Sequence, residues 1–210
     1  MQRIWWALLR QGFRLLYREM AWSYDWVSWI VSLGNWRDWQ RVAMHYASGT
    51  RVLDLAFGTG NLLLDWHTMA ITPVGVDLSL QMARIAAQKL RARALPLTLT
   101  QGRAQALPFA NATFDSVVST FPAEFILERA TVKEAIRVLC PGGLFVVVVN
   151  ARLTRRDLLG RCLEWLYAIT GQRPSLPPVK ELRLPDELSA QWEEKEGQGW
   201  VTTVLVGRKD

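Results

Sequence analysis

The chain has 210 residues, half of them apolar, and a net charge of +6. This length and apolar content predict one domain with a sizeable core and a small appendage. No uninterrupted apolar run approaches the roughly 18–20 residues of a membrane span, and arginines recur through the N-terminus where a signal peptide would be apolar. The positive charge allows a nucleic acid or an anionic membrane surface as partner and selects neither. The two cysteines, Cys140 and Cys162, have no metal-binding or redox spacing, so we expect no metal site and a cytoplasmic setting.

Residues 1–18 carry four arginines and no acidic residue. At about 100° per residue the arginines share one narrow helical face, and apolar side chains fill the remainder. This layout is typical of a helix that lies in a membrane interface with its arginines toward anionic phosphates. The residues that we expect at such a surface are Trp5, Trp6, Arg10 and Arg14. The alternative is a helix packed on the domain, or on a second subunit, with its arginines in solvent.

Residues 20–45 are rich in aromatic side chains and predict two short helices broken near Gly34. Such side chains form either a lid over a ligand cleft or a core against a sheet. We expect core packing for most of them, and a position facing the cleft for Tyr17, Trp22 and Tyr24. Residues 1–45 are therefore predicted to form an N-terminal lid or membrane-surface element, and residues 46–210 the main domain.

The next segment combines a strand with a glycine-rich turn. Arg51–Leu55 has the alternation of a buried strand, Gly58 and Gly60 follow one residue apart, and a helix is predicted over Gly60–Ala70. A turn of this kind brings bare backbone N–H groups and a helix N-terminus up to a ligand.

A second predicted strand, Val74–Asp77, ends on an acidic residue 17 positions beyond Gly60. An acidic side chain at that distance is suited to hold a ribose diol. The two segments together indicate an adenosine-containing cofactor.

The rest of the chain alternates predicted strands and helices. These are helix Ser79–Ala94, strand Leu97–Gln101, turn Ala104–Leu107, strand Phe114–Thr120, helix Ala123–Leu139 ended by residues 141–143, strand Leu144–Asn150, helix Thr154–Thr170, a loop over residues 171–187, and a hairpin of Ser189–Glu196 with Trp200–Arg208. The pattern predicts an α/β fold: a Rossmann-like, doubly wound, mostly parallel sheet with a C-terminal antiparallel hairpin and N-terminal helices.

With these motifs in place, the sequence resembles the class I S-adenosylmethionine (SAM)-dependent methyltransferases from about Tyr24 to Arg208. Five segments in order carry the resemblance: Val52–Asn61, Val76–Met82, Gly102–Phe109, Phe114–Ser119 and Arg137–Gly143. Each segment alone is a weak signal, but five at family spacing are a strong one. The element around Tyr24 and Asp25 is also similar to the entry helices of ubiquinone/menaquinone C-methyltransferases and bacterial phospholipid N-methyltransferases.

The resemblance implies SAM as cofactor and a role for particular positions. Asp54 and the turn from Ala56 through Phe57, Gly58 and Gly60 to Asn61 would hold the methionine part. Asp77 would take the ribose hydroxyls, and Leu78 and Met82 would enclose adenine. Residues Arg103, Ala104 and Gln105 would meet the adenine edge, the backbone near Ser119 and Thr120 would receive the methionine ammonium, and Tyr24 would close over the donor.

Two positions depart from the family pattern. The family usually has glycine where Ala56 stands, because the backbone there passes close to the ligand. It usually has an acid where Arg103 stands, and arginine has only donors, so it cannot accept a hydrogen bond from the adenine amino group. Gln105 or a backbone carbonyl is the substitute that we consider.

Methyl transfer from a sulfonium asks mainly for alignment of the reacting groups and sometimes for removal of a proton. Glu124, just past the predicted fourth strand, is positioned to orient an amine or take a proton, and Tyr24 to touch the acceptor. The alternative for Glu124 is a first-turn acid favoured by the helix dipole. The interfacial helix predicted over residues 1–18 and the aromatic lid predict a hydrophobic, membrane-associated acceptor, either a phospholipid amine or a quinone-type lipid.

Other functions fit parts of the sequence. A nucleic-acid methyltransferase suits the basic charge, but residues 120–123 lack the Asn/Asp-Pro-Pro-aromatic tetrad of many such enzymes, and no basic cluster interleaves with aromatics in the body, so we expect no nucleic-acid partner. A nicotinamide-dependent dehydrogenase would want a small residue where Leu63 stands. A non-catalytic adenosine-binding protein is the reading that Ala56 and Arg103 leave open.

Overall fold

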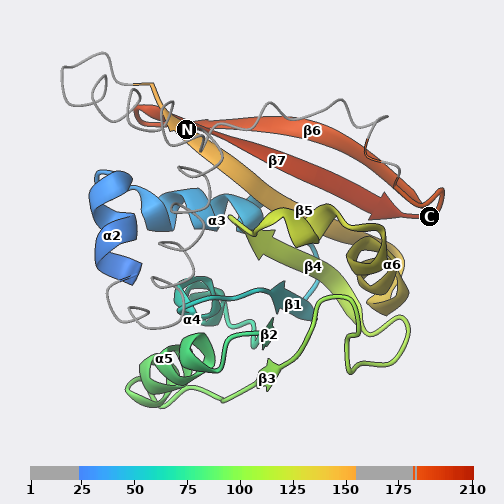
Figure 1. Ribbon diagram of the computed structural model, residues 1–210, viewed down its shortest axis with the longest axis horizontal. Coiled ribbons are helices and arrows are strands. Elements are labelled where there is room, and N and C mark those ends of the chain that lie inside the picture. The colour runs from blue at the N-terminus through green and yellow to red at the C-terminus, as the bar shows by residue number, and fades with distance from the viewer. Residues whose placement is uncertain (1–23, 155–181, 183) are drawn as a thin grey trace, which may run out of the picture.

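The computed structural model describes residues 24–154, 182 and 184–210. Within these residues, seven strands form a single sheet in the order β3-β2-β1-β4-β5-β7-β6 (Figure 1). The strands are β1 Val52–Leu55, β2 Val74–Asp77, β3 Leu99–Gln101, β4 Phe114–Thr120, β5 Leu139–Leu153, β6 Leu188–Gly197 and β7 Trp200–Lys209. Strands β1 to β5 pair in parallel, and β7 pairs antiparallel with both β5 and β6. The predicted fold class is confirmed.

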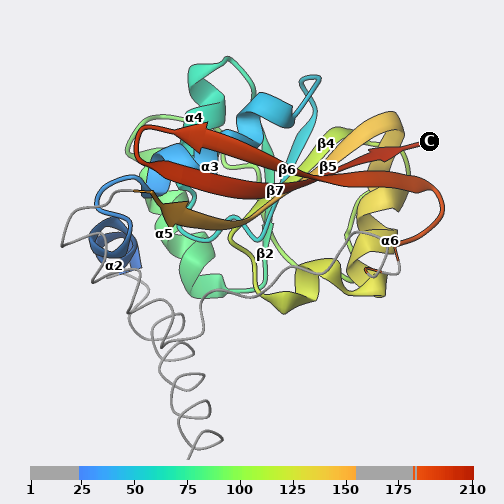
Figure 2. The ribbon, with the colours of Figure 1, turned by 90° about the horizontal axis from the view of Figure 1, so that it is seen from above.

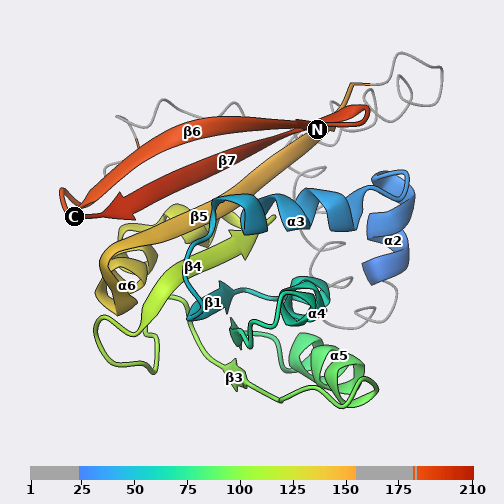
Figure 3. The same ribbon diagram turned by 180° about the vertical axis from the view of Figure 1, so that it is seen from behind.

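The strand order places a switch point in the middle of the sheet. From β1 the chain winds outward through β2 to β3 and then returns to the other side of β1 as β4. Asp54 in β1 has Gly75 of β2 as its partner on one side and Val118 of β4 on the other. In an open parallel sheet, a ligand binds in the crevice outside the carboxyl ends of the strands at this point. In Figures 1 and 3 the arrowhead of β4 marks the carboxyl end of the parallel strands, where this crevice is expected.

Helices cover both faces of the sheet. They are α2 Tyr24–Val31, α3 Trp36–Tyr46, α4 Asn61–Thr68, α5 Leu80–Arg91, the 3₁₀ helix η2 Glu124–Leu127 and α6 Arg129–Val138. The connections β1–α4–β2 and β4–α6–β5 run in opposite directions along the sheet, so right-handed crossovers put α4 and α6 on opposite faces (Figure 2). None of the helices in the described part of the chain is long and apolar enough to cross a membrane.

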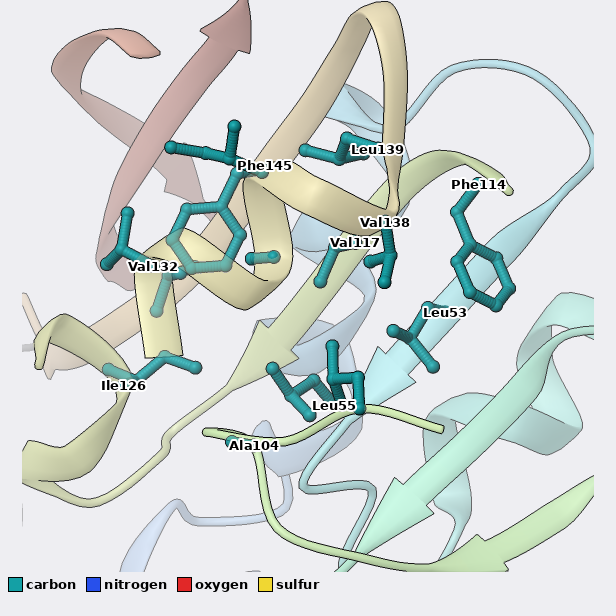
Figure 4. Close-up of a cluster of buried hydrophobic side chains, with 14 of the residues drawn as sticks. Leu53, Leu55, Ala104, Phe114, Val117, Ile126, Val132, Val138, Leu139 and Phe145 are labelled. Carbon is teal, nitrogen blue, oxygen red and sulfur yellow. The ribbon is translucent and has the colours of Figure 1, made fainter. Parts of the chain in front are cut away.

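Two apolar clusters hold these layers together. One lies between the sheet and α6, where Leu53, Val117 and Phe145 point into a common interior (Figure 4). The other joins α3 and α4 to the opposite face and includes Trp39 and Trp66. Successive residues of a strand face opposite sides, so each central strand contributes to both clusters.

The N-terminal helices form as predicted, with a break at Gly34. Its φ of +85° is a left-handed conformation, and its N–H donates to the Trp29 carbonyl at 2.8 Å, which ends α2. The following helix packs against the sheet, where Trp36 stacks on Phe121 with ring centroids 4.5 Å apart. The expectation of core packing is wrong for Trp26 and Trp29, whose exposed fractions are 68% and 58%.

The helix predicted over Ala123–Leu139 is wrong in two ways. Glu128 has the extended angles φ −61° and ψ 138°, so the segment divides into η2 and α6. The α-helix ends at Val138, and the Pro141-Gly142-Gly143 stretch belongs to β5 rather than to a helix end. Proline cannot donate a ladder hydrogen bond, and the register with β4 shifts at this place, as expected for a bulge.

Other predicted boundaries differ less or cannot be compared. Strand β5 spans Leu139–Leu153 instead of Leu144–Asn150, while the hairpin β6–β7 is extended by one residue at most of its ends. Several predicted features lie outside the described residues: the predicted helix Thr154–Thr170 beyond its first residue, Cys162, and the N-terminal positions Trp5, Trp6, Arg10, Arg14, Tyr17 and Trp22. The division at residue 45 stays a prediction.

Candidate cofactor site

The turn between β1 and α4 exposes backbone at the switch point. Ala56, Gly58 and Gly60 all have left-handed angles, with φ of +62°, +57° and +77°. A Cβ added to Gly58 would meet no atom within 4 Å, whereas one on Gly60 would come within 2.7 Å of the Ala86 Cβ. Gly60 is therefore required for the packing of α4 on α5, whereas the space beside the Gly58 Cα is open to a ligand.

Asp77, at the end of β2, is bonded to this turn. Its Oδ2 accepts the N–H of Gly58 at 2.8 Å, and its Oδ1 accepts the N–H of Ser79 at 2.7 Å. Burial raises the pKa of Asp77, and the backbone hydrogen bonds from Ser79 and Gly58 oppose that rise. The carboxylate thus connects the two strands whose ends form the crevice.

Asp54, in the centre of β1, is a buried acid with too few hydrogen-bond donors around its carboxyl group. It is 1% exposed, and its Oδ2 has no hydrogen-bond partner among the residues that the structure describes. Burial, and then the negative charge of Asp77, raise the pKa of Asp54 to about 8. A buried carboxylate oxygen without a donor is costly. A cationic ligand next to it would satisfy it, and the ammonium of the methionine part of SAM is such a group.

A cavity of about 200 Å³ lies beside the turn. Six residues singled out in the sequence line it: Ala56, Asp77, Leu78, Arg103, Ala104 and Gln105. Leu78 is 65% exposed and offers an apolar surface that a flat base can cover. Phe125 of η2 also lines the cavity, and sequence reasoning missed it, although it directly follows Glu124. Mostly apolar walls that also carry one carboxylate, one amide and one guanidinium fit a nucleoside.

Two of the three residues predicted to meet the adenine edge, Arg103 and Gln105, have different environments. Arg103 is exposed, and its carbonyl accepts the N–H of Ala106 at 3.1 Å. The amide nitrogen of Gln105 donates to Glu128 at 2.9 Å, which fixes the side chain by its donor end. The carbonyl oxygen of Gln105 is not used in that bond, so it is the acceptor available where Arg103 offers none.

The remaining predicted positions lie around the crevice or in the core. Ser119 is fully buried and donates from its Oγ to the carbonyl of Leu55 at 2.6 Å, and Thr120 accepts from Gln40 on α3 at 3.3 Å. Met82 is 1% exposed and Phe57 4%, so both side chains are part of the interior. Tyr24 is the first residue of α2 and Glu124 the first of η2.

A polar cluster that the sequence did not predict holds α2 on the glycine turn. Asp25 accepts from Thr59 at 2.6 Å and from Asn61 at 3.0 Å with Oδ1, and from Lys89 on α5 at 2.5 Å with Oδ2. Lys89 also donates to the Asn61 side chain at 2.7 Å. Burial is the largest single influence and opposes ionisation of Asp25, but the hydrogen bonds from Lys89, Thr59 and Asn61 and the positive charge of Lys89 together outweigh it, so the pKa of Asp25 is lowered. Asn61 therefore faces this cluster from the start of α4.

Relatives with this sequence pattern are methyltransferases. The family model of a methyltransferase domain matches residues 52–143. The ubiquinone/menaquinone biosynthesis C-methyltransferase UbiE of Syntrophotalea carbinolica is 35% identical over 162 residues, which are 72% of this chain and 68% of that protein. The demethylmenaquinone methyltransferase of Symbiobacterium thermophilum is 34% identical over 145 residues, which are 65% of this chain and 58% of that protein. The chain thus spans about six-tenths to two-thirds of the length of these relatives.

Solved structures show the same fold. The protein PH0226 of Pyrococcus horikoshii has a TM-score of 0.60 at 21% identity, over 95% of this chain and 99% of that one. A geranyl diphosphate methyltransferase in complex with SAM has a TM-score of 0.60 at 12% identity, over 83% of this chain and 85% of that one. The sequence relatives give the family: the chain belongs to the SAM-dependent methyltransferases.

Proposed function

We propose that this protein transfers a methyl group from SAM to a hydrophobic acceptor of the quinone type. The observation that supports the donor is Asp54, a buried carboxylate with an unpartnered oxygen at the switch point beside Asp77. The acceptor class comes from relatives, several of which are named as ubiquinone or menaquinone methyltransferases at 32–35% identity.

The donor would be held by residues on both sides of the glycine turn. Asp54 and the backbone from Ala56 to Gly60 would take the methionine part, and Asp77 the ribose. Leu78 and Phe125 would flank adenine, with its amino edge toward the carbonyl of Gln105. When bound, SAM supplies an already activated methyl group, so the protein needs no nucleophile or metal of its own for that activation.

The chain's own residues would then align the acceptor and remove a proton. Methylation of a ring carbon leaves that carbon with a hydrogen to lose, and we assign Glu124 to accept this proton. Tyr24 is assigned to close over the donor and contact the acceptor. Both assignments are supported by position: α2 begins beside the cluster on the glycine turn, and η2 carries the cavity residue Phe125 directly after Glu124.

A membrane surface is the second part of the proposal. Residues 1–18, with four arginines and no acid, would bind anionic phosphates, and the protein would act in the cytoplasm at the periphery of a membrane. This would bring the crevice close to an acceptor that is dissolved in lipid. In this proposal residues 1–45 form the lid and surface element, and residues 46–210 the transferase domain.

A methylation assay with the full chain tests the proposed reaction. The chain is incubated with methyl-labelled SAM and either a demethylated quinol or a phosphatidylethanolamine dispersion. We expect label in the quinol, loss of labelling in Glu124→Gln, and retention in Glu187→Gln, which changes an exposed glutamate far along the chain. Label in the phospholipid alone would replace the quinone by a lipid amine. Label in neither lipid would contradict the proposed acceptor class.

A further inference from the structure

The polarity of helix α2 is inverted relative to an ordinary surface helix. Its inner face carries Asp25, which bonds the glycine turn, and Ser28, which is 4% exposed. Its outer face carries Trp26, Trp29 and Ile30, with exposed fractions of 68%, 58% and 56%. A helix at a water boundary normally turns its apolar stripe to the core and its polar residues to solvent.

This outer face is the main gathering of exposed apolar side chains in the described part of the chain. Of the eight large hydrophobic residues that are exposed there, four belong to α2, and the others are Met69, Leu78, Leu80 and Leu97. Single exposed apolar residues are ordinary, whereas a contiguous patch marks a surface with a partner. The only residue of α2 that is charged at neutral pH is Asp25, and its carboxylate bonds Lys89 on the inner side.

The orientation of this face is fixed by the protein interior. Asp25 is held by three donors, from Thr59, Asn61 and Lys89, and the Gly34 N–H closes the helix on the Trp29 carbonyl. The exposure of the tryptophans is therefore set by bonds on the opposite side of the same helix. Helix α2 stands at the end of the sheet toward which β4 points (Figures 1 and 3), which is the end that holds the crevice.

We propose that the outer face of α2, formed by Trp26, Val27, Trp29 and Ile30, inserts into the headgroup boundary of an anionic lipid bilayer. Tryptophan prefers this boundary, where its ring is shielded and its N–H stays hydrated. The preceding residues 1–18 add four arginines and no acid, which complements anionic headgroups and repels a second copy of the same chain. The inference deepens the proposed function and rests on it for the acceptor, since α2 on a bilayer brings the crevice to a lipid-dissolved molecule.

Vesicle flotation with the full chain tests this docking surface without any catalysis. The vesicles contain equimolar phosphatidylglycerol and phosphatidylcholine, and the variant is Trp26→Ser/Trp29→Ser/Ile30→Ser. We expect its partition onto vesicles to fall by on the order of tenfold or more, because three apolar side chains leave the interface. The matched control Met69→Ser/Leu97→Ser, which alters exposed apolar residues elsewhere, should bind as the unaltered chain does. Circular dichroism checks that both variants fold.

Two results would overturn the inference. One is equal vesicle binding by the triple variant and the unaltered chain. The other is that the unaltered chain does not bind vesicles and sediments as a dimer, whereas the triple variant sediments as a monomer. That result would make α2 an interface between two copies of the chain. A chain that binds vesicles through α2 but methylates no quinol would refute the proposed function and leave the docking surface in place.

Discussion

Lys89 on α5 and Asp25 on α2 are joined by a 2.5 Å hydrogen-bonded ion pair across 64 residues of sequence. The pair has side-chain exposures of 23% and 36%, so water screens it only in part. Through Thr59 and Asn61, the same carboxylate also fixes the turn that exposes the Gly58 backbone. The N-terminal helix is thus a structural support of the cofactor site.

Replacing Asp25 with alanine should loosen that support. We expect a loss of about 1–2 kcal/mol in the free energy of unfolding, because Lys89 and Asn61 lose hydrogen bonds to a charged group that is partly screened by solvent. Affinity for S-adenosylhomocysteine should fall as well. Urea unfolding and calorimetry measure the two effects. The control Asp38→Ala removes an exposed pair with Arg41 and should cost less than about 1 kcal/mol, with ligand affinity unchanged. Equal ligand affinity in Asp25→Ala and the unaltered chain would show that α2 does not support the site.

Ala56 is a second testable position because its φ of +62° suits glycine better than alanine. Ala56→Gly should raise the free energy of unfolding by about 0.5–1 kcal/mol, after the larger chain entropy of glycine in the unfolded state is subtracted. It should also tighten S-adenosylhomocysteine binding, because a methyl group leaves the cavity wall. Ala112→Gly, at an exposed residue with φ of +52°, is the control that should stabilise the fold without changing ligand affinity. A weaker-binding Ala56→Gly variant would contradict the placement of the ligand over this turn.

The buried carboxyl of Asp54 predicts a pH dependence of stability. An unfolded aspartic acid titrates near pH 4, whereas the pKa of Asp54 in the folded protein is about 8. Between these values the folded state holds the extra proton, so the free energy of unfolding of the ligand-free protein should fall as the pH rises through this window. Chemical unfolding at a series of pH values measures the slope, which should be smaller in Asp54→Asn. An unchanged slope in that variant would contradict the raised pKa.

The same carboxyl predicts proton release on ligand binding. The ammonium of S-adenosylhomocysteine next to Asp54 favours the ionised form, so binding near pH 7 should release a proton. Calorimetry in two buffers with different ionisation enthalpies measures that release. Asp54→Asn should release none, while Asp186→Asn, at an exposed position, should behave as the unaltered chain. Identical heats in both buffers for the unaltered chain would contradict this role.

Arg103 can be changed to the acid that the family usually has there. Arg103 lines the cavity and is exposed. Arg103→Asp should therefore raise the affinity for S-adenosylhomocysteine several-fold, which corresponds to the gain of about one hydrogen bond from the adenine amino group to a charged acceptor. Arg129→Asp makes the same change in net charge at an exposed residue outside the cavity and should leave the affinity unaltered. If both variants bind equally, the adenine edge does not lie at residue 103.

The fold class and the glycine turn could be predicted from the sequence because their signals are local. The buried runs that form β1 and β2, and the glycines between them, indicate a strand, a turn and a helix without knowledge of distant contacts, whereas the strand order that makes this turn a switch point comes from the structure. The split between η2 and α6 has no such signal, since only the extended angle at Glu128 separates them. Residues 141–143 predict a helix end but form a bulge in β5, because proline and glycine occur at both places.

The supports of the site could not be predicted for a different reason. Asp25 and Lys89 meet only in the folded chain, and no spacing rule connects residues that far apart. Aromatic composition indicates a packed or lid-forming segment but does not determine which tryptophans face outward, so the core packing expected for most of them does not hold for Trp26 and Trp29. Phe125 could not be predicted because a single phenylalanine after a strand carries no local sign that it lines a cavity.

The most direct test of the central claim, that the end of β1 and the carboxylate ending β2 bind SAM, is calorimetric titration of the full chain with S-adenosylhomocysteine. We predict saturable binding in the micromolar range, a loss of at least about tenfold in affinity for Asp77→Asn, and no loss for Asp186→Asn. No heat at high micromolar ligand, or full affinity in Asp77→Asn, would contradict the claim.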